Sequence, residues 1–310
     1  MYRTGHQASS RPLRRMMGAS FRQARRSPRC PEAPRLDGWL AVVTGATGGI
    51  GLEIARGLGH RGADIVLPCR NLAKGERVAR DLRAAAPGVR IDLVEADLED
   101  LESVRRAAAA IARLAAGRSV RLLVENAGIW PRTYATTRQG HEIAFGVNVL
   151  AHFALRRELE AAGLLERARI VVLTGDIYVF ASACTPDFRW RGARGGMQAY
   201  CRSKLGNLWI AAELVQRRPS FEVRVVHPGV VATNLGGDAG SAGNWFKRFL
   251  MISPEEGAQM PLICATQPGL ENGSYWHNVH GRMLLPAEDP ARDRAAAAAL
   301  WGHCEALACQ

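Results

Sequence analysis

Short apolar runs alternate with amphipathic segments along most of the chain. Runs rich in Val, Ile and Leu predict buried strands, and the segments between them carry apolar residues at helical spacing. Strands are predicted at residues 39–44, 63–67, 89–94, 120–124, 169–173, 221–226 and 274–276. Helices are predicted at residues 50–60, 72–86, 101–116, 141–162, 197–218 and 254–265. Because strand and helix alternate, right-handed crossovers are expected, and the fold class is α/β with a doubly wound parallel sheet in three α/β/α layers.

No linker interrupts this pattern between residues 37 and 310, so a single domain is expected there. Residues 1–36 differ, because they hold nine Arg and one acid, Glu32, within a formal net charge of +12. We interpret them as a basic, flexible N-terminal extension. Their Ser- and Arg-rich composition also resembles an organellar transit peptide. The other 274 residues carry 32 basic and 28 acidic side chains, so no nucleic-acid partner is expected, although the extension leaves that alternative open.

Two further classes are excluded by composition. No run approaches the roughly 18 apolar residues of a membrane-spanning helix, so no transmembrane segment is expected. The seven cysteines are odd in number and include no CxxC or zinc-like spacing. Reduced thiols in a cytoplasmic protein, with no metal site, are therefore expected.

A glycine-rich turn follows the first predicted strand and precedes a helix. Glycines let the backbone approach a pyrophosphate, and the helix directs its free N–H groups at that anion. The strand–turn–helix context favours a dinucleotide site of the Rossmann fold over a plain tight turn. The predicted cofactor residues here are Gly45, Thr47, Gly49, Ile50 and Gly51.

The end of the second predicted strand bears on which dinucleotide binds. An acid there usually meets the ribose of NAD(H), but this strand is followed by Arg70, with Lys74 one helical turn on. A guanidinium offers a planar fork of donors to a phosphate. NADP(H) is therefore favoured over NAD(H).

Tyr200 and Lys204 open the helix after the fifth predicted strand. Positions i and i+4 share a helix face, so the phenol and the ammonium point into the same space. A neighbouring cation favours the phenolate and so lowers the pKa of the phenol. Lowering that pKa from its ordinary value to near neutral pH takes ~3 units, or ~4 kcal/mol. Tyr200 is predicted to be a general acid–base for a carbonyl or alcohol, with Lys204 supporting it.

These motifs together resemble the short-chain dehydrogenase/reductase family. The glycine-rich loop matches its TGxxxGIG, and Tyr200 with Lys204 matches its YxxxK. Segments reading CRNxxKG from Cys69 and GxExxFGVN from Gly140 look like its retinol-dehydrogenase-like and WW-domain-oxidoreductase-like branch, and the resemblance covers roughly residues 38–305.

The resemblance implies further site residues. Asp97 and Leu98 would meet the adenine, and Asn148 would hold a water that connects Lys204 to solvent. Glu125 stands where the family has the first Asn of NNAG, and a buried acid there needs a partner. The remaining implied cofactor residues are Asn126, Ala127, Gly128, Pro228, Gly229, Val231 and Thr233.

The family's catalytic serine is missing, because Gly175 occupies its place. Losing a donor to the developing oxyanion typically costs ~3 kcal/mol. We take as a hypothesis that the adjacent Thr174 supplies the hydroxyl. Asp176, Tyr178 or a group of the substrate are alternatives, and so is a protein that binds cofactor without efficient turnover.

The resemblance therefore predicts an NADP(H)-dependent oxidoreductase that interconverts an alcohol and a ketone or aldehyde. An apolar loop at residues 234–253, with Phe188 and Trp190, favours a lipophilic substrate, whereas Arg189, Arg191 and Arg194 would select an anionic one. The alternative is a catalytically impaired cofactor-binding or scaffold protein. A homodimer or homotetramer, formed through the helices that carry Asn148 and Tyr200, is expected from the family.

Overall fold

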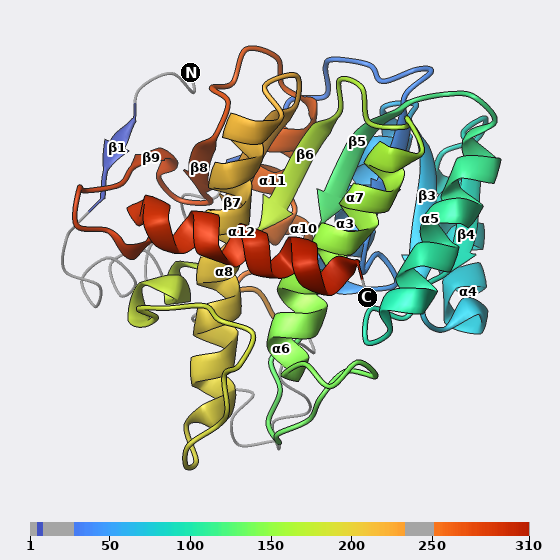
Figure 1. Ribbon diagram of the computed structural model, residues 1–310. Helices are drawn as coiled ribbons and strands as arrows, with labels where there is room; N and C mark the ends of the chain where they lie inside the picture. The colour runs from blue at the N-terminus through green and yellow to red at the C-terminus, as the bar shows by residue number, and fades with distance from the viewer. Residues whose placement is uncertain (1–4, 9–27, 233–250, 310) are drawn as a thin grey trace, which may run out of the picture.

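A nine-stranded sheet forms the centre of the protein over the residues that the computed structural model describes, 5–8, 28–232 and 251–309 (Figure 1). Its strand order is β1-β9-β8-β7-β6-β5-β2-β3-β4. All neighbouring strands are parallel except β8 and β9. In numerical order, β1 to β9 span His6–Gln7, Leu40–Val43, Asp64–Cys69, Ile91–Glu95, Val120–Glu125, Arg169–Leu173, Glu222–His227, Ser274–His277 and Gly281–Leu284.

Helices cover both faces of the sheet, as the predicted three-layer arrangement requires (Figure 1). Within β2, Leu40 and Val42 enter one hydrophobic core, and Ala41 and Val43 enter the other. This period of two explains why a continuous apolar run forms a strand that is buried on both sides. One layer holds α5 (Leu101–Ala115), α7 (Ala151–Ala161), α8 (Gly195–Arg217) and α12 (Arg294–Ala308), and the other holds α3 (Gly49–His60), α4 (Leu72–Ala85), α10 (Pro254–Gly257) and α11 (Gln259–Thr266).

The two strands beyond β8, which are β9 and the edge strand β1, were not predicted. β9 returns antiparallel to β8, and β1, from the N-terminal extension, pairs in parallel with β9. The flexibility predicted for the N-terminal extension stays a prediction. Cys30 also contacts the domain through its backbone N–H, which donates to Gln259 Oε1 at 2.9 Å. Both strands are short and lack the apolar pattern that marks the central strands.

Helix α12 lies across the outer side of α7 and α8 (Figure 1). Its Trp301 ring packs edge-on against Phe153 of α7, with ring centroids 4.9 Å apart, and lies under the Arg217 guanidinium of α8. The oligomer predicted through α7 and α8 stays a prediction, and α12 covers part of the surface it would use. None of the helices described has the length and apolarity needed to cross a membrane.

The strand order reverses between β2 and β5. The chain runs outward from β2 to β3 and β4, and then returns to place β5 on the other side of β2. Ligands of open α/β sheets bind in the crevice that opens at the carboxyl ends of strands at such a point. The turn after β2 and the segment after β5 therefore face one another where a ligand is expected.

A buried ion pair holds one side of this crevice. Glu125, the last residue of β5, accepts a hydrogen bond from Arg156 of α7, and both side chains are less than 5% exposed. The prediction that an acid at position 125 needs a partner is thereby confirmed. A buried pair with few alternative partners depends on both of its members, because either one alone is an uncompensated charge.

We expect Glu125→Ala to lower the free energy of unfolding by about 3–5 kcal/mol, because it leaves the Arg156 guanidinium buried and unpaired. Urea denaturation followed by circular dichroism measures this change. The double variant Glu125→Leu/Arg156→Met, which removes both charges, is expected to recover most of the loss. A single variant as stable as the wild type would contradict this account of the pair.

Candidate active site

One cavity of about 1310 Å³ opens at the carboxyl ends of the central strands. It brings together predicted residues that are far apart in the sequence. The implied cofactor residue Thr233 and most of the apolar loop at residues 234–253 lie outside the described residues. The predicted site residues that line it are Gly45, Thr47, Gly49, Ile50, Gly51, Arg70, Lys74, Asp97, Leu98, Asn126, Ala127, Gly128, Thr174, Tyr200, Lys204, Pro228, Gly229 and Val231.

The glycine-rich loop requires its glycines for steric reasons. Gly45 has a φ of +68°, a conformation that L side chains rarely adopt. A Cβ on Gly51 would lie 2.5 Å from the Gly45 carbonyl oxygen and 2.4 Å from Asn126 Nδ2. Asn126 in turn donates from Nδ2 to the Thr44 carbonyl at 2.8 Å. The loop is thus held tightly against the end of β5, with the start of α3 at the cavity.

Thr44 organises this junction, although it was not predicted as a site residue. Its hydroxyl accepts the backbone N–H groups of Asn126 and Ala127, each at 3.0 Å, and lies 2.9 Å from His152 Nε2. Burial lowers the pKa of His152, so a neutral imidazole is expected at neutral pH. The sequence signal available for this junction was His152, which lies four residues after Asn148 and so on the same helix face as that predicted site residue.

Two basic side chains lie at the end of the cavity beside β3. Arg70 pairs with Glu99 at 2.7 Å on the protein surface. The Lys74 ammonium extends over the glycine-rich loop, 3.7 Å from where a Cβ on Gly48 would lie. Asp97, after β4, accepts the backbone N–H of Glu99 at 3.0 Å. A dinucleotide fits this donor set, because glycines leave room for its pyrophosphate and cations stand beyond it for a further phosphate.

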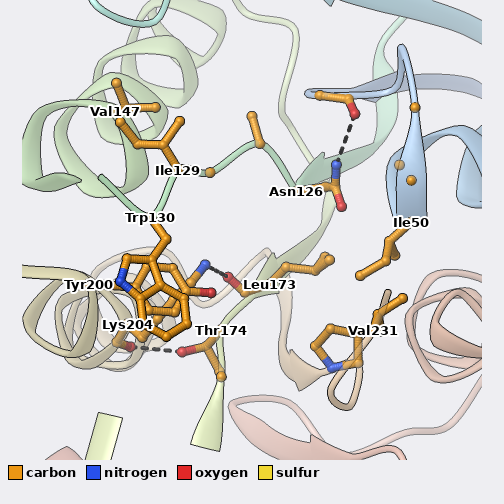
Figure 2. A pocket seen from close by; sticks show the side chains of 18 of the residues that line it. Ile50, Asn126, Ile129, Trp130, Val147, Leu173, Thr174, Tyr200, Lys204 and Val231 are labelled. Atoms are coloured by element: carbon orange, nitrogen blue, oxygen red, sulfur yellow. Dashed lines mark hydrogen bonds between the residues drawn. The ribbon is translucent and has the colours of Figure 1, made fainter. Parts of the chain in front are cut away.

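Tyr200 and Lys204 lie on one face of α8 at the wall of the cavity (Figure 2). The Lys204 ammonium donates to the Leu173 carbonyl at 3.2 Å and lies 5.5 Å from the centre of the Tyr200 ring. Burial lowers the pKa of Lys204 to about 8 and raises the pKa of the Tyr200 phenol. The protein alone therefore keeps the phenol protonated, which is the form that donates a proton to a carbonyl oxygen.

Trp130 covers one face of the Tyr200 ring, with ring centroids 4.9 Å apart and nearly parallel planes (Figure 2). The loop that carries it is anchored by Asn148, in a π-helical turn at Gly146–Leu150. Asn148 accepts the Ile129 N–H at 2.8 Å and donates to the Ile129 carbonyl at 3.0 Å and to Ser203 at 2.9 Å. The predicted water relay from Asn148 to Lys204 stays a prediction, and the observed contacts give Asn148 a positioning role.

The proposed replacement of the serine by Thr174 does not agree with this geometry. The Thr174 hydroxyl donates to the carbonyl oxygen of Lys204 at 2.8 Å (Figure 2). Because a hydroxyl has one hydrogen, it cannot donate to a substrate oxygen while this bond is made. Tyr178 is fully buried and donates to Asp289, which directs it away from the cavity.

Gly175 itself has a backbone conformation that any residue can adopt, with φ −155° and ψ 141°. The nearest atoms to a Cβ built there are Ile177 Cγ2 at 3.7 Å and, at 4.0 Å, His227 Nδ1 and Lys204 Cγ. These are ordinary van der Waals separations, so a Cβ at this position would fit without rearrangement.

The aromatic residues before α8 do not line the cavity as expected. Trp190 packs over the first turn of α8 and donates to Glu142 at 3.1 Å, and the Phe188 ring lies 4.2 Å from the Arg202 guanidinium carbon. Arg189, Arg191 and Arg194 are also not among the lining residues. The apolar side chains that do line the cavity include Trp130, Met197 and Met251.

Comparison with known families agrees with this arrangement. The family model described as short chain dehydrogenase matches residues 40–242. The chain belongs to the short-chain dehydrogenase family. Human retinol dehydrogenase 11 is 31% identical over 94% of this chain and 93% of its own, and the mouse protein of that name is 35% identical over 80% and 79%. The chain is therefore a retinol-dehydrogenase-like member and an NAD(P)-dependent oxidoreductase that acts on CH–OH groups.

Solved structures of the family share the fold. An uncharacterized protein from Mycobacterium paratuberculosis matches with a TM-score of 0.70 at 30% identity, covering 92% of this chain and 96% of its own. A blue fluorescent protein from a metagenomic library, solved in complex with NADPH, matches with a TM-score of 0.64 at 26% identity, over 80% and 99%.

The lowered pKa of Lys204 predicts the pH dependence of this dehydrogenase. Lys204 carries its charge below pH 8 and loses it above, so kcat/KM for NADPH is expected to be level below pH 8 and to fall above it, approaching tenfold per pH unit. Initial rates from pH 6 to 10 measure this profile.

Two variants separate Lys204 from other groups that titrate. Lys204→Arg keeps a cation and is expected to remove the fall at pH 8 even where the rate is lower, whereas Lys74→Gln is expected to leave the fall in place. A profile that stays level to pH 10 in the wild type would rule out a titrating Lys204.

Proposed function

We propose that this chain is an NADP(H)-dependent oxidoreductase that interconverts an alcohol and a ketone or aldehyde, with Tyr200 as its general acid–base. The observation that carries the proposal is the placement of Tyr200 and Lys204 on one helix face, in the same cavity as the glycine-rich loop. That arrangement puts a proton donor within reach of a substrate held beside a dinucleotide.

Each residue has a distinct part in the proposed reaction. When bound, the nicotinamide cofactor supplies or accepts the hydride. During reduction the Tyr200 phenol donates its proton to the carbonyl oxygen, and burial favours this protonated form. Lys204, held by the Leu173 carbonyl, supplies a cation that stabilises the phenolate left behind. Asn148 positions the loop whose Trp130 covers the phenol.

The preference for NADP(H) rests on Arg70 and Lys74 and on the absence of an acid directly after β3. Arg70 is paired with Glu99, so a 2′-phosphate would take the place of that carboxylate. Exchange is favourable because a phosphate carries more negative charge and more acceptor oxygens than a carboxylate. The structural relative with bound NADPH supports the same preference.

The substrate we propose is lipophilic. Trp130, stacked on Tyr200, contributes apolar surface to the cavity, as do Met197 and Met251. The curated relatives are named retinol dehydrogenases, which fits a hydrophobic alcohol or aldehyde. The competing function is a protein that binds the dinucleotide without efficient turnover, and Gly175 in place of the catalytic serine favours it.

Tyr200→Phe is expected to lower kcat for carbonyl reduction about 10²–10⁴-fold, because it removes the proton donor. The dissociation constant for NADPH, measured by fluorescence titration, should change less than about threefold, since the ring is retained. Cys201→Ala, at the next position of α8, serves as the control and is expected to keep its rate. Unchanged turnover in Tyr200→Phe would refute the assigned role.

Arg70→Ala is expected to raise the KM for NADPH roughly tenfold and to leave the KM for NADH nearly unchanged, because a charge-assisted hydrogen bond to phosphate is lost. Glu99→Gln removes the competing carboxylate and is expected to lower the KM for NADPH. An equal change of both cofactors' KM in Arg70→Ala would argue against a 2′-phosphate contact.

A further inference from the structure

The space beside Gly175 has one polar wall. Of the three atoms that approach a Cβ built at Gly175, two are carbons and the third is His227 Nδ1 at 4.0 Å. His227 ends β7, and it lines the same cavity as Gly175 and Tyr200. The imidazole therefore faces the volume that a serine side chain would fill.

His227 belongs to a buried polar cluster with Asp176 and His277. One nitrogen or oxygen atom from each of the three lies within 4.8 Å of the other two. The Asp176 carboxylate accepts a hydrogen bond from Tyr275, and its other oxygen lies 3.2 Å from His277 Nε2. The two imidazole rings are 4.8 Å apart between centroids. Contacts with Asp176 and His277 therefore hold the His227 ring in place.

Two histidines and a carboxylate are also a common set of metal ligands, but the contacts here favour a hydrogen-bond network over a metal site. The backbone N–H of Val279 donates to His277 Nδ1 at 3.0 Å, and that of Asp176 donates to His227 Nδ1 at 3.4 Å. A ring whose Nδ1 accepts a hydrogen bond carries its proton on Nε2, whereas a ligating histidine normally donates from the nitrogen that does not bind the metal.

We propose that a water molecule in the serine-sized space beside Gly175, held by His227 Nδ1, donates the hydrogen bond to the substrate oxygen that the family's serine would give. The inference rests on the proposed function. The water donates one hydrogen to His227 Nδ1 and the other to the substrate oxygen, while the proton that completes the alcohol comes from Tyr200. No bond of the water breaks, so the contact is a hydrogen bond rather than a proton transfer.

The geometry suits a water in three respects. The contact from the Asp176 N–H is long, at 3.4 Å, so the single lone pair of Nδ1 can be shared with a shorter hydrogen bond from a water. Replacing serine by glycine frees about the volume of one water, and a bridging water is nearly as favourable as a direct hydrogen bond. The Thr174 hydroxyl, the other nearby donor, is already bonded to Lys204.

The test measures kcat for NADPH-dependent carbonyl reduction in His227→Leu and His227→Asn, each made in the wild type and in Gly175→Ser. In the wild-type background, His227→Leu is expected to lower kcat about 10²-fold, comparable to loss of an oxyanion donor. His227→Asn, whose amide places a polar atom near the former Nδ1, is expected to lose less than about fivefold. In the Gly175→Ser background, His227→Leu should lose less than about threefold, because the hydroxyl takes over the contact.

Gly175→Ala is the matched control for the space itself. Its methyl group fills the volume without adding a donor, so its kcat is expected to fall as in His227→Leu, and the two changes combined should add little. NADPH titration of every variant checks that each one folds and binds cofactor.

The outcomes are separable. Equal losses for His227→Leu in both backgrounds would mark His227 as structural and overturn the proposal, as would no loss in either. Turnover only in Gly175→Ser variants would overturn the water contact while leaving Tyr200 chemistry intact. No turnover in any variant, with NADPH bound, would refute the proposed function and with it this inference.

Discussion

The burial of one ammonium group, that of Lys204, constrains the whole active site. A charge in the interior is unfavourable unless polar groups meet it, and here the carbonyl of Leu173 at the end of β6 does so. Asn207 donates to the same carbonyl at 3.1 Å, and Thr174 donates back to the Lys204 backbone. These three bonds join the end of β6 to α8 and so fix where the Tyr200 phenol lies.

These hydrogen bonds between the end of β6 and α8 also explain the roles of residues 174 and 175. The Thr174 hydroxyl donates its hydrogen to the Lys204 carbonyl of α8, so the residue next to the missing serine has a structural role. Gly175, immediately after it, leaves open space toward His227. On the cavity side, the buried cluster of Asp176, His227 and His277 borders the same space.

A second group of contacts sets the cofactor end of the cavity. Thr44 and Asn126 tie the glycine-rich loop to β5, and the Glu125–Arg156 pair ties β5 to α7. Asn148, on the segment that leads into α7, then anchors the loop of Trp130. The indole that covers Tyr200 is thus linked, through successive polar contacts, to the loop that a pyrophosphate would approach. Cofactor and substrate regions share one framework rather than two independent ones.

The sequence by itself determined the strands β2 to β8, the helices that alternate with them and the family, because each depends on local pattern. A run such as Leu40–Val43 must be buried on both faces, and Tyr200 and Lys204 must share a helix face four residues apart. It also showed that Gly175 interrupts the family's catalytic set. Only the tertiary structure decided which atoms meet across the cavity: the bond of Thr174 to Lys204, the stacking of Trp130 on Tyr200 and the position of His227 beside Gly175. Those contacts join side chains from different strands and loops, and no local periodicity records the direction in which such side chains point.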